Sequence, residues 1–160
     1  MGVAYPITAA VRQLRQAGVA FVPRLYDYVE RGGTAASSAA LGVDEHSVVK
    51  TLVFEDERRS PFIILMHGDR EVSLKALARH LEVKTVRPCA PEVAERHTGY
   101  KVGGTSPFGL RKPLPICVER SVLALPSLLL NGGARGFLIE ISAHDLARTL
   151  EPRPVEVATT

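Results

Sequence analysis

The chain has 160 residues, of which 46% are hydrophobic, and a formal net charge of +3 at pH 7. A chain of this length can bury roughly two thirds of the surface that its unfolded state exposes, so we expect one domain spanning residues 1–160. No stretch reaches the ~18 uninterrupted apolar residues of a membrane helix, and residues 1–6 lack the features of a secretion signal. We therefore expect a cytoplasmic protein with no membrane partner.

Local patterns predict short helices that alternate with strands. Periodic apolar residues, with Thr8 and Ser73 placed to cap helix starts and Gly42 placed to end a helix, predict three helices in the first half. These helices span residues 8–17, 34–41 and 74–81. Aliphatic and aromatic runs predict strands between them. These strands span residues 21–26, 48–54 and 62–67, and the charged turn 55–60 joins the last two as an antiparallel hairpin.

The second half continues the alternation. Pro91 is placed to open a helix that Gly99 ends, and Ser142 with Asp145 forms a capping-box start for a last helix that reaches Leu150. The predicted strands here span residues 85–86, 116–118, 128–130, 137–141 and 155–157. Because helices and strands are interspersed and one strand pair is joined by a tight turn, we expect an α+β fold with a mixed, largely antiparallel sheet.

Positive charge is concentrated in one part of the chain. Residues 84–112 carry six Lys or Arg and two acids, which gives this segment a charge of +4 and leaves −1 for the remainder. A site for a phosphorylated or nucleic-acid ligand needs such a concentration, because local potential steers the encounter more than net charge does. A solvated basic face is the alternative interpretation.

Lys50 interrupts the apolar run that spans residues 48–54. In a strand with little solvated surface, a lysine must reach a pocket, a partner anion or solvent along its stem. The alternative is a lysine at a strand edge, which blocks aggregation and keeps its ammonium in water.

Residues 99–109 contain four glycines and Pro107, which is too many for a strand or a helix. Such a loop exposes backbone N–H groups, so it could cradle a carbonyl oxygen or a phosphate, or it could be a plain long connection. A second glycine-rich segment, residues 131–136, is predicted to be a hairpin loop, with Arg135 as a candidate phosphate or ribose contact. Tyr26 could stack on a base or close the core.

The sequence disfavours several common kinds of hydrolase. The five histidines show neither HxH nor HxxxH spacing, and no serine lies in a GxSxG turn. Cys89 and Cys117 form no Cys-x-x-Cys pair, so neither a zinc site nor a disulfide framework is indicated. No sequence feature lowers the pKa of Cys89, and we interpret it as a buried, inert thiol rather than a nucleophile. We expect no metal and no cofactor.

These residues resemble the YbaK domain family, also called the prolyl-tRNA synthetase-associated or editing domain, and in particular its cysteinyl-tRNA(Pro) deacylase branch. The motifs that carry the resemblance fall in the family's order and at similar spacing across nearly the whole chain. They are Val-Lys-Thr-Leu at 49–52, Thr-Gly-Tyr-Lys-Val-Gly-Gly-Thr-Ser-Pro-Phe-Gly at 98–109, Gly-Gly-Ala-Arg-Gly at 132–136, Ile-Glu at 139–140 and Asp-Leu-Ala at 145–147. The TGYxVGGxSPxG pattern is specific, whereas the lysine strand alone is weak evidence.

The resemblance implies a mixed sheet curled into a partly open barrel, with helices packed around it. The family's functional lysine falls on Lys50 and its loop glycine on Gly103 or Gly104, which are the catalytic candidates. The substrate-binding candidates are Tyr26, Thr51, Thr105, Ser106, Pro107, Gly109, Arg135 and Leu138.

The resemblance also implies a reaction, the cleavage of the ester that joins a wrong amino acid to the terminal ribose of tRNA. In the cysteine-specific branch the substrate's own thiol attacks its carbonyl and releases a cyclic thiolactone. The protein then mainly orients the ester and stabilises the developing oxyanion. The implied partners are the acceptor end of aminoacyl-tRNA and prolyl-tRNA synthetase, and not DNA.

Two positions bear on which amino acid is removed. Leu138 stands before Ile139, where the cysteine branch carries an acidic residue, and this change makes the pocket more apolar. Thr51 favours cysteine, because relatives that remove alanine carry Asn after the lysine. The alternatives are therefore an alanine-specific deacylase, a module that binds the acceptor end or a synthetase without turnover, and a binder of small esters or phosphates.

Overall fold

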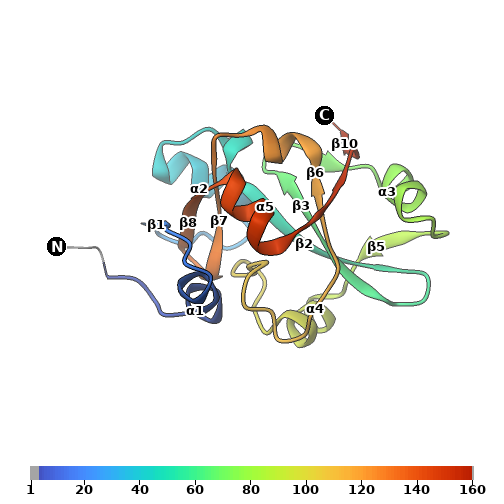
Figure 1. Cartoon of the computed structure of the whole chain (residues 1–160), viewed down its shortest axis with the longest axis horizontal. Helices are drawn as coiled ribbons and strands as arrows, with labels where there is room; N and C mark the ends of the chain where they lie inside the picture. The colour runs from blue at the N-terminus through green and yellow to red at the C-terminus, as the bar shows by residue number, and fades with distance from the viewer. Residues whose placement is uncertain (1–3, 160) are drawn as a thin grey trace.

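A five-stranded mixed sheet forms the centre of the fold (Figure 1), in a computed structural model that describes residues 4–159. Its strands lie in the order β5-β2-β3-β6-β9. Their bounds are β2 (Val49–Asp56), β3 (Pro61–His67), β5 (Val86–Pro88), β6 (Ile116–Glu119) and β9 (Arg153–Val155). β2 is antiparallel to β3 and β5, whereas β6 is parallel to β3 and β9. The predicted hairpin and the mixed sheet are both confirmed.

Two smaller sheets flank the first. β1 (Val22–Leu25), β8 (Phe137–Ser142) and β7 (Ser127–Ala134) form an antiparallel sheet in that order, and β4 (Glu71–Val72) pairs with β10 (Ala158–Thr159). A parallel bridge between Val48 and Leu129 joins the start of β2 to β7. The five-stranded and three-stranded sheets share one apolar cluster and do not form a closed barrel within residues 4–159, which agrees with the expected partly open barrel.

Five α-helices of the described chain cover these sheets, and each lies where the sequence predicts one (Figure 1). They are α1 (Ala9–Gln16), α2 (Gly33–Leu41), α3 (Leu74–Leu81), α4 (Pro91–Thr98) and α5 (Ala143–Leu150). The side chains of Thr8, Ser73 and Ser142 accept hydrogen bonds from the first turns of α1, α3 and α5, as predicted. Two 3₁₀ helices, η1 (Glu45–Ser47) and η2 (Arg120–Ala124), precede β2 and β7. Within residues 4–159 no helix has the length and apolarity to cross a membrane.

The β2–β3 hairpin separates two apolar clusters. Ile63 and Leu65 point into the larger cluster, with α1, α5 and the three-stranded sheet, whereas Ile64 and Met66 point into the smaller one beneath α3. All four side chains have no exposed surface. Because alternate strand residues face opposite sides, both faces of β3 are covered, whereas residues 50–53 of β2 are partly exposed.

The structure corrects the prediction for residues 131–136. β7 runs on to Ala134, and only Arg135 and Gly136 form the turn to β8. The register shifts between Asn131 and Ala134, where the Asn131 Oδ1 accepts hydrogen bonds from the N–H groups of Gly133 and Ala134. The glycines therefore form a β-bulge, held by one side chain, rather than a loop.

Candidate functional site

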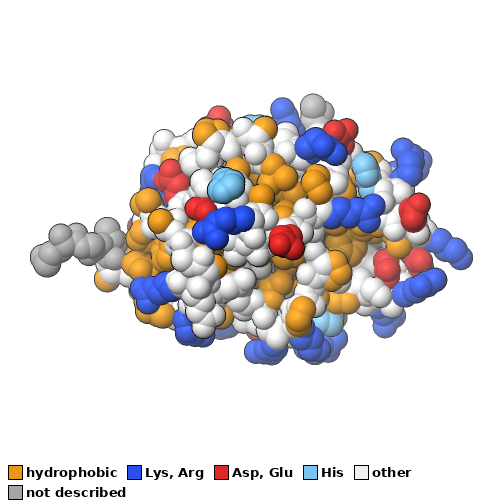
Figure 2. Space-filling model, in the orientation of Figure 1, with side chains coloured by type: hydrophobic (Ala, Val, Ile, Leu, Met, Phe, Trp, Pro, Cys, Tyr) orange, Lys and Arg blue, Asp and Glu red, His pale blue; other side chains and the backbone are white. Residues whose placement is uncertain are grey.

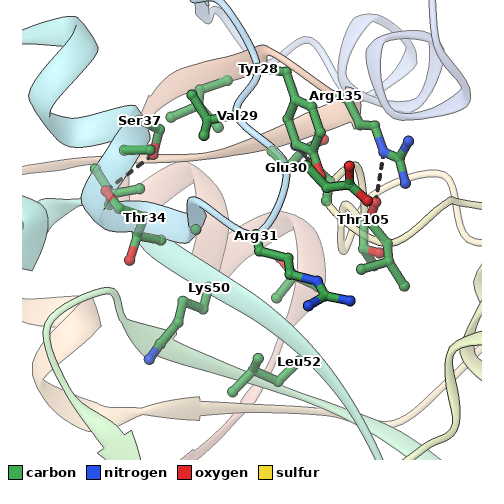
Figure 3. A pocket seen from close by; sticks show the side chains of 18 of the residues that line it. Tyr28, Val29, Glu30, Arg31, Thr34, Ser37, Lys50, Leu52, Thr105 and Arg135 are labelled. Atoms are coloured by element: carbon green, nitrogen blue, oxygen red, sulfur yellow. Dashed lines mark hydrogen bonds between the residues drawn. The ribbon is translucent and has the colours of Figure 1, made fainter.

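A cavity of about 770 Å³ lies along one edge of β2 (Figure 3). Figure 3 shows Lys50 and Leu52 on β2 at one side and Tyr28, Glu30 and Arg135 at the other. The remaining walls come from α2, the start of α4 and the first half of the glycine-rich loop 99–109, here called the glycine loop. Residues that line it include Tyr26, Thr34, Val48, Thr51, Cys89, Pro91, Val102, Gly103, Thr105, Asn131 and Leu138.

The edge of β2 that faces this cavity is unpaired over several residues. β3 pairs with the other edge along almost the whole strand, whereas β5 joins the cavity edge only at Phe54–Asp56. The Val53 carbonyl, which accepts from the Cys89 N–H at 3.0 Å, lies on that edge. Residues two apart present their backbone groups to the same edge. The N–H and C=O of Thr51 therefore face the cavity, with no strand of residues 4–159 paired to them.

The Thr51 side chain strengthens this polar position. Its Oγ1 is buried and has no hydrogen-bond partner within the part of the chain that the structure describes. A buried hydroxyl without a partner is costly. A polar ligand group at the β2 edge would relieve that cost, so Thr51 offers up to three hydrogen-bonding groups at one point of the cavity.

Lys50 places a positive charge at the cavity wall. Its Nζ donates to the Arg70 carbonyl at 2.6 Å and lies 3.5 Å from the Glu71 carboxylate. The Lys50 side chain is 19% exposed and the Glu71 side chain 79%. The ammonium is thus held in place from one side, and a lysine has three donors, so it keeps hydrogen-bonding capacity for a ligand.

The glycine loop divides into two halves with different positions. Gly103 and Thr105 line the cavity. Ser106 is fully buried, and its hydroxyl accepts from the Phe108 N–H. The Gly109 N–H donates to the Gln13 side chain of α1. The second half therefore anchors the loop in the core, while the first half is presented to a ligand.

The two loop glycines also differ. The Gly104 N–H donates to the Lys101 carbonyl at 2.8 Å, so it is engaged within the loop. Gly103 has a φ of +87°, and its N–H makes no hydrogen bond to any residue among 4–159. A Cβ on Gly103 would collide with the hydroxyl of Tyr28. Gly103 thus presents a free backbone donor at a position that only glycine can occupy without displacing Tyr28.

Three side chains fix this half of the loop against the β7–β8 turn. Asn131 Nδ2 donates to the Gly103 carbonyl at 3.0 Å, and Arg135 Nε donates to the Val102 carbonyl at 2.9 Å. The Arg135 guanidinium lies 5.2 Å from the centre of the Tyr28 ring, which is a cation–π distance. These contacts hold Gly103, which lines the cavity.

Two further candidates, Leu138 and Tyr26, form the apolar end of the cavity. Leu138 is 5% exposed and packs with Val48 and Leu129, and Tyr26 packs against them. The Tyr26 N–H donates to the Gly136 carbonyl, and burial raises the pKa of its phenol. Leu138 and Tyr26 therefore supply apolar surface, with the phenol in its neutral form at physiological pH.

Cys89 is the cysteine at this cavity. Burial, followed by the hydrogen bond to and the charge of Glu55, raises the pKa of its thiol to about 12. The reactive form of a cysteine is its thiolate. Cys89 is therefore protonated near neutral pH, and the interpretation of an inert thiol agrees with its surroundings.

Comparisons with known proteins decide the family. The model of the aminoacyl-tRNA editing domain matches residues 31–149, most of the chain. The protein belongs to the aminoacyl-tRNA editing domain family. It is 28% identical over 153 residues to the "Putative Cys-tRNA(Pro)/Cys-tRNA(Cys) deacylase EbsC" of Enterococcus faecalis, a match that covers 95% of this chain and 93% of that protein.

Other matches give the relation to longer enzymes and to solved structures. The proline–tRNA ligase of Ligilactobacillus salivarius is 29% identical over 61% of this editing domain, which corresponds to 17% of the ligase. The crystal structure of the hypothetical protein APE2540 superposes with a TM-score of 0.86 at 22% identity, covering 94% of this chain and 99% of that one. A "putative trans-editing enzyme for prolyl tRNA synthetase" superposes with a TM-score of 0.84 at 21% identity, covering 98% and 100%. These structures share the fold of this editing domain.

The editing-domain cavity brings together seven of the eleven candidate residues. They are Tyr26, Lys50, Thr51, Gly103, Thr105, Arg135 and Leu138. The other four do not line it. Gly104 packs against the backbone of the β7–β8 turn, and Ser106, Pro107 and Gly109 belong to the buried half of the loop.

Two residues that line the cavity, Tyr28 and Asn131, are not among the candidates that the sequence predicts. Tyr28 lies in the irregular segment after β1, where no motif or periodicity distinguishes it. Asn131 was assigned to a loop, although an Asn before two glycines is a signal that its side chain bonds the next N–H groups. Asn131 donates a hydrogen bond to the Gly103 carbonyl, and the Tyr28 hydroxyl lies where a Cβ on Gly103 would point.

Proposed function

We propose that this protein is a trans-editing deacylase that removes cysteine from Cys-tRNA(Pro) by substrate-assisted cleavage of the ester. The observation that carries the proposal is the cavity at the unpaired edge of β2. Free backbone donors, the Lys50 ammonium and the Cys89 thiol, which is protonated near neutral pH, all line it. Such a site can bind and polarise an ester but supplies no thiolate of its own. The similarity to EbsC over nearly the whole chain supports cysteine as the amino acid.

In the proposed reaction the cysteinyl sulfur attacks the carbonyl carbon of its own ester. The bond from that carbon to the ribose oxygen breaks, the ribose oxygen takes the proton that the thiol loses, and a four-membered thiolactone leaves. The N–H groups of Gly103 and Thr51 stabilise the negative charge that develops on the carbonyl oxygen. Lys50 contacts the terminal phosphate or ribose, and Thr51 borders the amino-acid pocket.

Three roles follow for the surrounding residues. Thr105 and Arg135 lie at the same mouth as Gly103, where the terminal nucleotide would enter. Tyr26 and Leu138 cover the apolar end, where a small side chain would bind. Ser106, Pro107, Gly104 and Gly109 act indirectly, by holding the loop that carries Gly103.

The proposal extends to partners and setting. The match to a short part of proline–tRNA ligases supports prolyl-tRNA synthetase as a partner that supplies mischarged tRNA(Pro). We infer a cytoplasmic protein in which residues 1–160 act as one domain.

Alanine is the second candidate amino acid. Leu138 is apolar and nearly fully buried at the cavity end, and no carboxylate is present at that position to contact a thiol. An alanyl ester has no thiol, so its removal requires water as the nucleophile rather than self-attack.

The test compares release of amino acid from Cys-tRNA(Pro) and Ala-tRNA(Pro), with the thiolactone trapped by an added amine. We expect fast loss of cysteine with trapped thiolactone and slow loss of alanine. Release of free cysteine without thiolactone would contradict substrate assistance, and loss of alanine alone would move the enzyme to the other specificity. Binding of both substrates without turnover would leave only a tRNA-binding module.

Replacing Cys89 with alanine is expected to leave the deacylation rate within about twofold of the wild type, because a thiol with a pKa of about 12 is not ionised at pH 7. The wild-type rate should instead rise with pH as the substrate thiol, with a pKa of about 8.5, ionises. Initial rates of both proteins measured between pH 6 and 9, corrected for spontaneous hydrolysis, check this. A rate that collapses in Cys89→Ala, with the fold intact by circular dichroism, would make Cys89 the nucleophile.

A further inference from the structure

We propose that a second cavity, between the β2–β3 turn and α4, binds phosphates of the single-stranded 3′ end of tRNA, an inference that rests on the proposed function. This cavity, here called the basic groove, has a volume of about 490 Å³. Its charged lining consists of Arg59, Arg87 and Arg96 against the single carboxylate Glu55. The groove therefore carries an excess of positive charge, which favours a polyanion.

Two of the three guanidiniums are available for a ligand. Arg87 donates from Nε and Nη2 to the Glu55 carboxylate, at 3.0 and 2.8 Å, so this pair largely neutralises itself. The side chains of Arg59 and Arg96 are exposed and make no hydrogen bond or ion pair with any residue among 4–159. Arg59 also lies close enough to Glu55 for its charge to lower the pKa of that carboxyl, after the larger effect of Arg87. The guanidinium groups of Arg59 and Arg96 remain without a direct partner, and guanidinium groups suit bidentate contacts with phosphate.

The backbone at Arg59 is held in a defined turn. Arg59 has a φ of +61°, in the left-handed region that Gly or Asn occupies at lower cost. Asp56 holds this turn, because its Oδ1 accepts hydrogen bonds from the N–H groups of Arg58 and Ser60. These hydrogen bonds fix the backbone that carries the Arg59 side chain at the groove.

His97 also lines the groove. Its Nδ1 is buried and has no hydrogen-bond partner in the described part of the chain. Burial, followed by the charges of Lys112 and Arg96, lowers the pKa of this imidazole. A neutral imidazole still offers one N–H donor to a phosphate oxygen, and Lys112 extends the positive potential beyond the groove.

The groove adjoins the cavity at the β2 edge. Cys89 lines both, and α4 lies between them, with Pro91 and Ala94 facing the first cavity and Val93 and Arg96 facing the groove. Lys and Arg side chains gather at the lower edge of the molecule beneath α4 in Figure 2. An RNA strand whose last ribose carries the ester in the first cavity can therefore place its preceding phosphates in the groove. Of the six basic residues in 84–112, Arg87 and Arg96 line the groove.

The test measures binding of an acceptor-stem RNA that carries no amino acid and ends in single-stranded CCA, by fluorescence anisotropy at several KCl concentrations. The variants are Arg59→Asn, which tolerates the left-handed backbone, Arg96→Gln, and both together. Arg79→Gln is the matched control, because Arg79 is an exposed helical arginine that lines neither cavity. Each groove variant is expected to weaken binding about three- to tenfold at low salt and to reduce the salt slope by about 1.

The same RNA without its CCA overhang locates the contact. The difference between wild type and groove variants should disappear on this blunt RNA. Equal affinity and slope of wild type and variants, a difference that persists on the blunt RNA, or no binding by the wild type would each overturn the proposal. Loss of binding to prolyl-tRNA synthetase with unchanged RNA binding would assign the groove to a protein partner instead.

RNA without an attached amino acid tests binding by the groove separately from the proposed deacylase activity. If the wild type fails to deacylate any aminoacyl-tRNA but groove variants lose CCA-dependent binding, the proposed deacylase activity is wrong and the proposed phosphate binding by the groove is supported. If deacylation occurs and the variants bind and react like the wild type, the proposed phosphate binding by the groove is wrong and the proposed deacylase activity is supported.

Discussion

Replacing Lys50 with alanine is expected to lower kcat/KM for deacylation of Cys-tRNA(Pro) by about 100-fold. Lys50 supplies a positive charge at the wall of the cavity, and its Nζ is fixed by the Arg70 carbonyl at 2.6 Å. A fixed charge in a site that excludes bulk water stabilises an anionic ligand group more than a mobile surface charge does. Steady-state rates on labelled substrate measure the change, and KM and kcat separate a contact with phosphate from stabilisation of the reacting ester.

Two further variants isolate the charge of Lys50 from its packing. Lys50→Met keeps most of the stem and should lose activity like Lys50→Ala, whereas Lys50→Arg keeps the charge and should recover part of it. Glu71→Gln removes the ion-pair partner, whose side chain is 79% exposed, and should change the rate by less than about threefold, since exposed pairs are weak. Full activity of Lys50→Ala would refute the proposed role of the lysine.

Replacing Gly109 with alanine is expected to destabilise the fold by about 4 kcal/mol or more. Gly109 has a φ of +65°, and a Cβ there would collide with the backbone of Ala9 and Ala10 at the start of α1. Because this backbone belongs to a capped helix in the core, it cannot move aside cheaply. Urea unfolding followed by circular dichroism measures the loss, and a shift in the midpoint without a change in slope would indicate a native-state effect.

Gly18→Ala is the matched control for Gly109→Ala. Gly18 has a φ of +67°, but nothing lies within 4 Å of the Cβ position. It therefore reports the cost of the backbone conformation alone, about 1 kcal/mol. Similar losses in the two variants would show that the loop can move away from α1, and the anchoring role of the second half of the glycine loop would be wrong.

The local signals in the sequence located the helices well. Thr8, Ser73 and Ser142 accept the capping hydrogen bonds that their positions predict, and Gly42 and Gly99 end their helices in the left-handed conformation. Such contacts span only a few residues, so the sequence contains all of their partners. The resemblance on motifs then identified the family, which the editing-domain match over residues 31–149 confirms.

The same local reasoning failed where the partner is distant. Residues 131–134 read as a loop because glycines disfavour strands, yet they continue β7, since β8 pairs with them across a bulge and Asn131 satisfies two N–H groups. Tyr28 carries no sequence signal, because its place depends on Gly103 and Arg135, more than seventy residues away.

The sequence by itself determined the helices, the β2–β3 hairpin, the basic segment and the family, because capping, strand periodicity, charge and motif spacing are properties of neighbouring residues. Only the tertiary structure decided what each half of the glycine loop does, that the edge of β2 at Thr51 is unpaired, and that Arg59 and Arg96 share one groove. The physical reason is that both features depend on residues that are distant in the sequence. A strand edge stays unpaired, and an arginine stays without an ion-pair partner, when no distant group of the chain lies beside it.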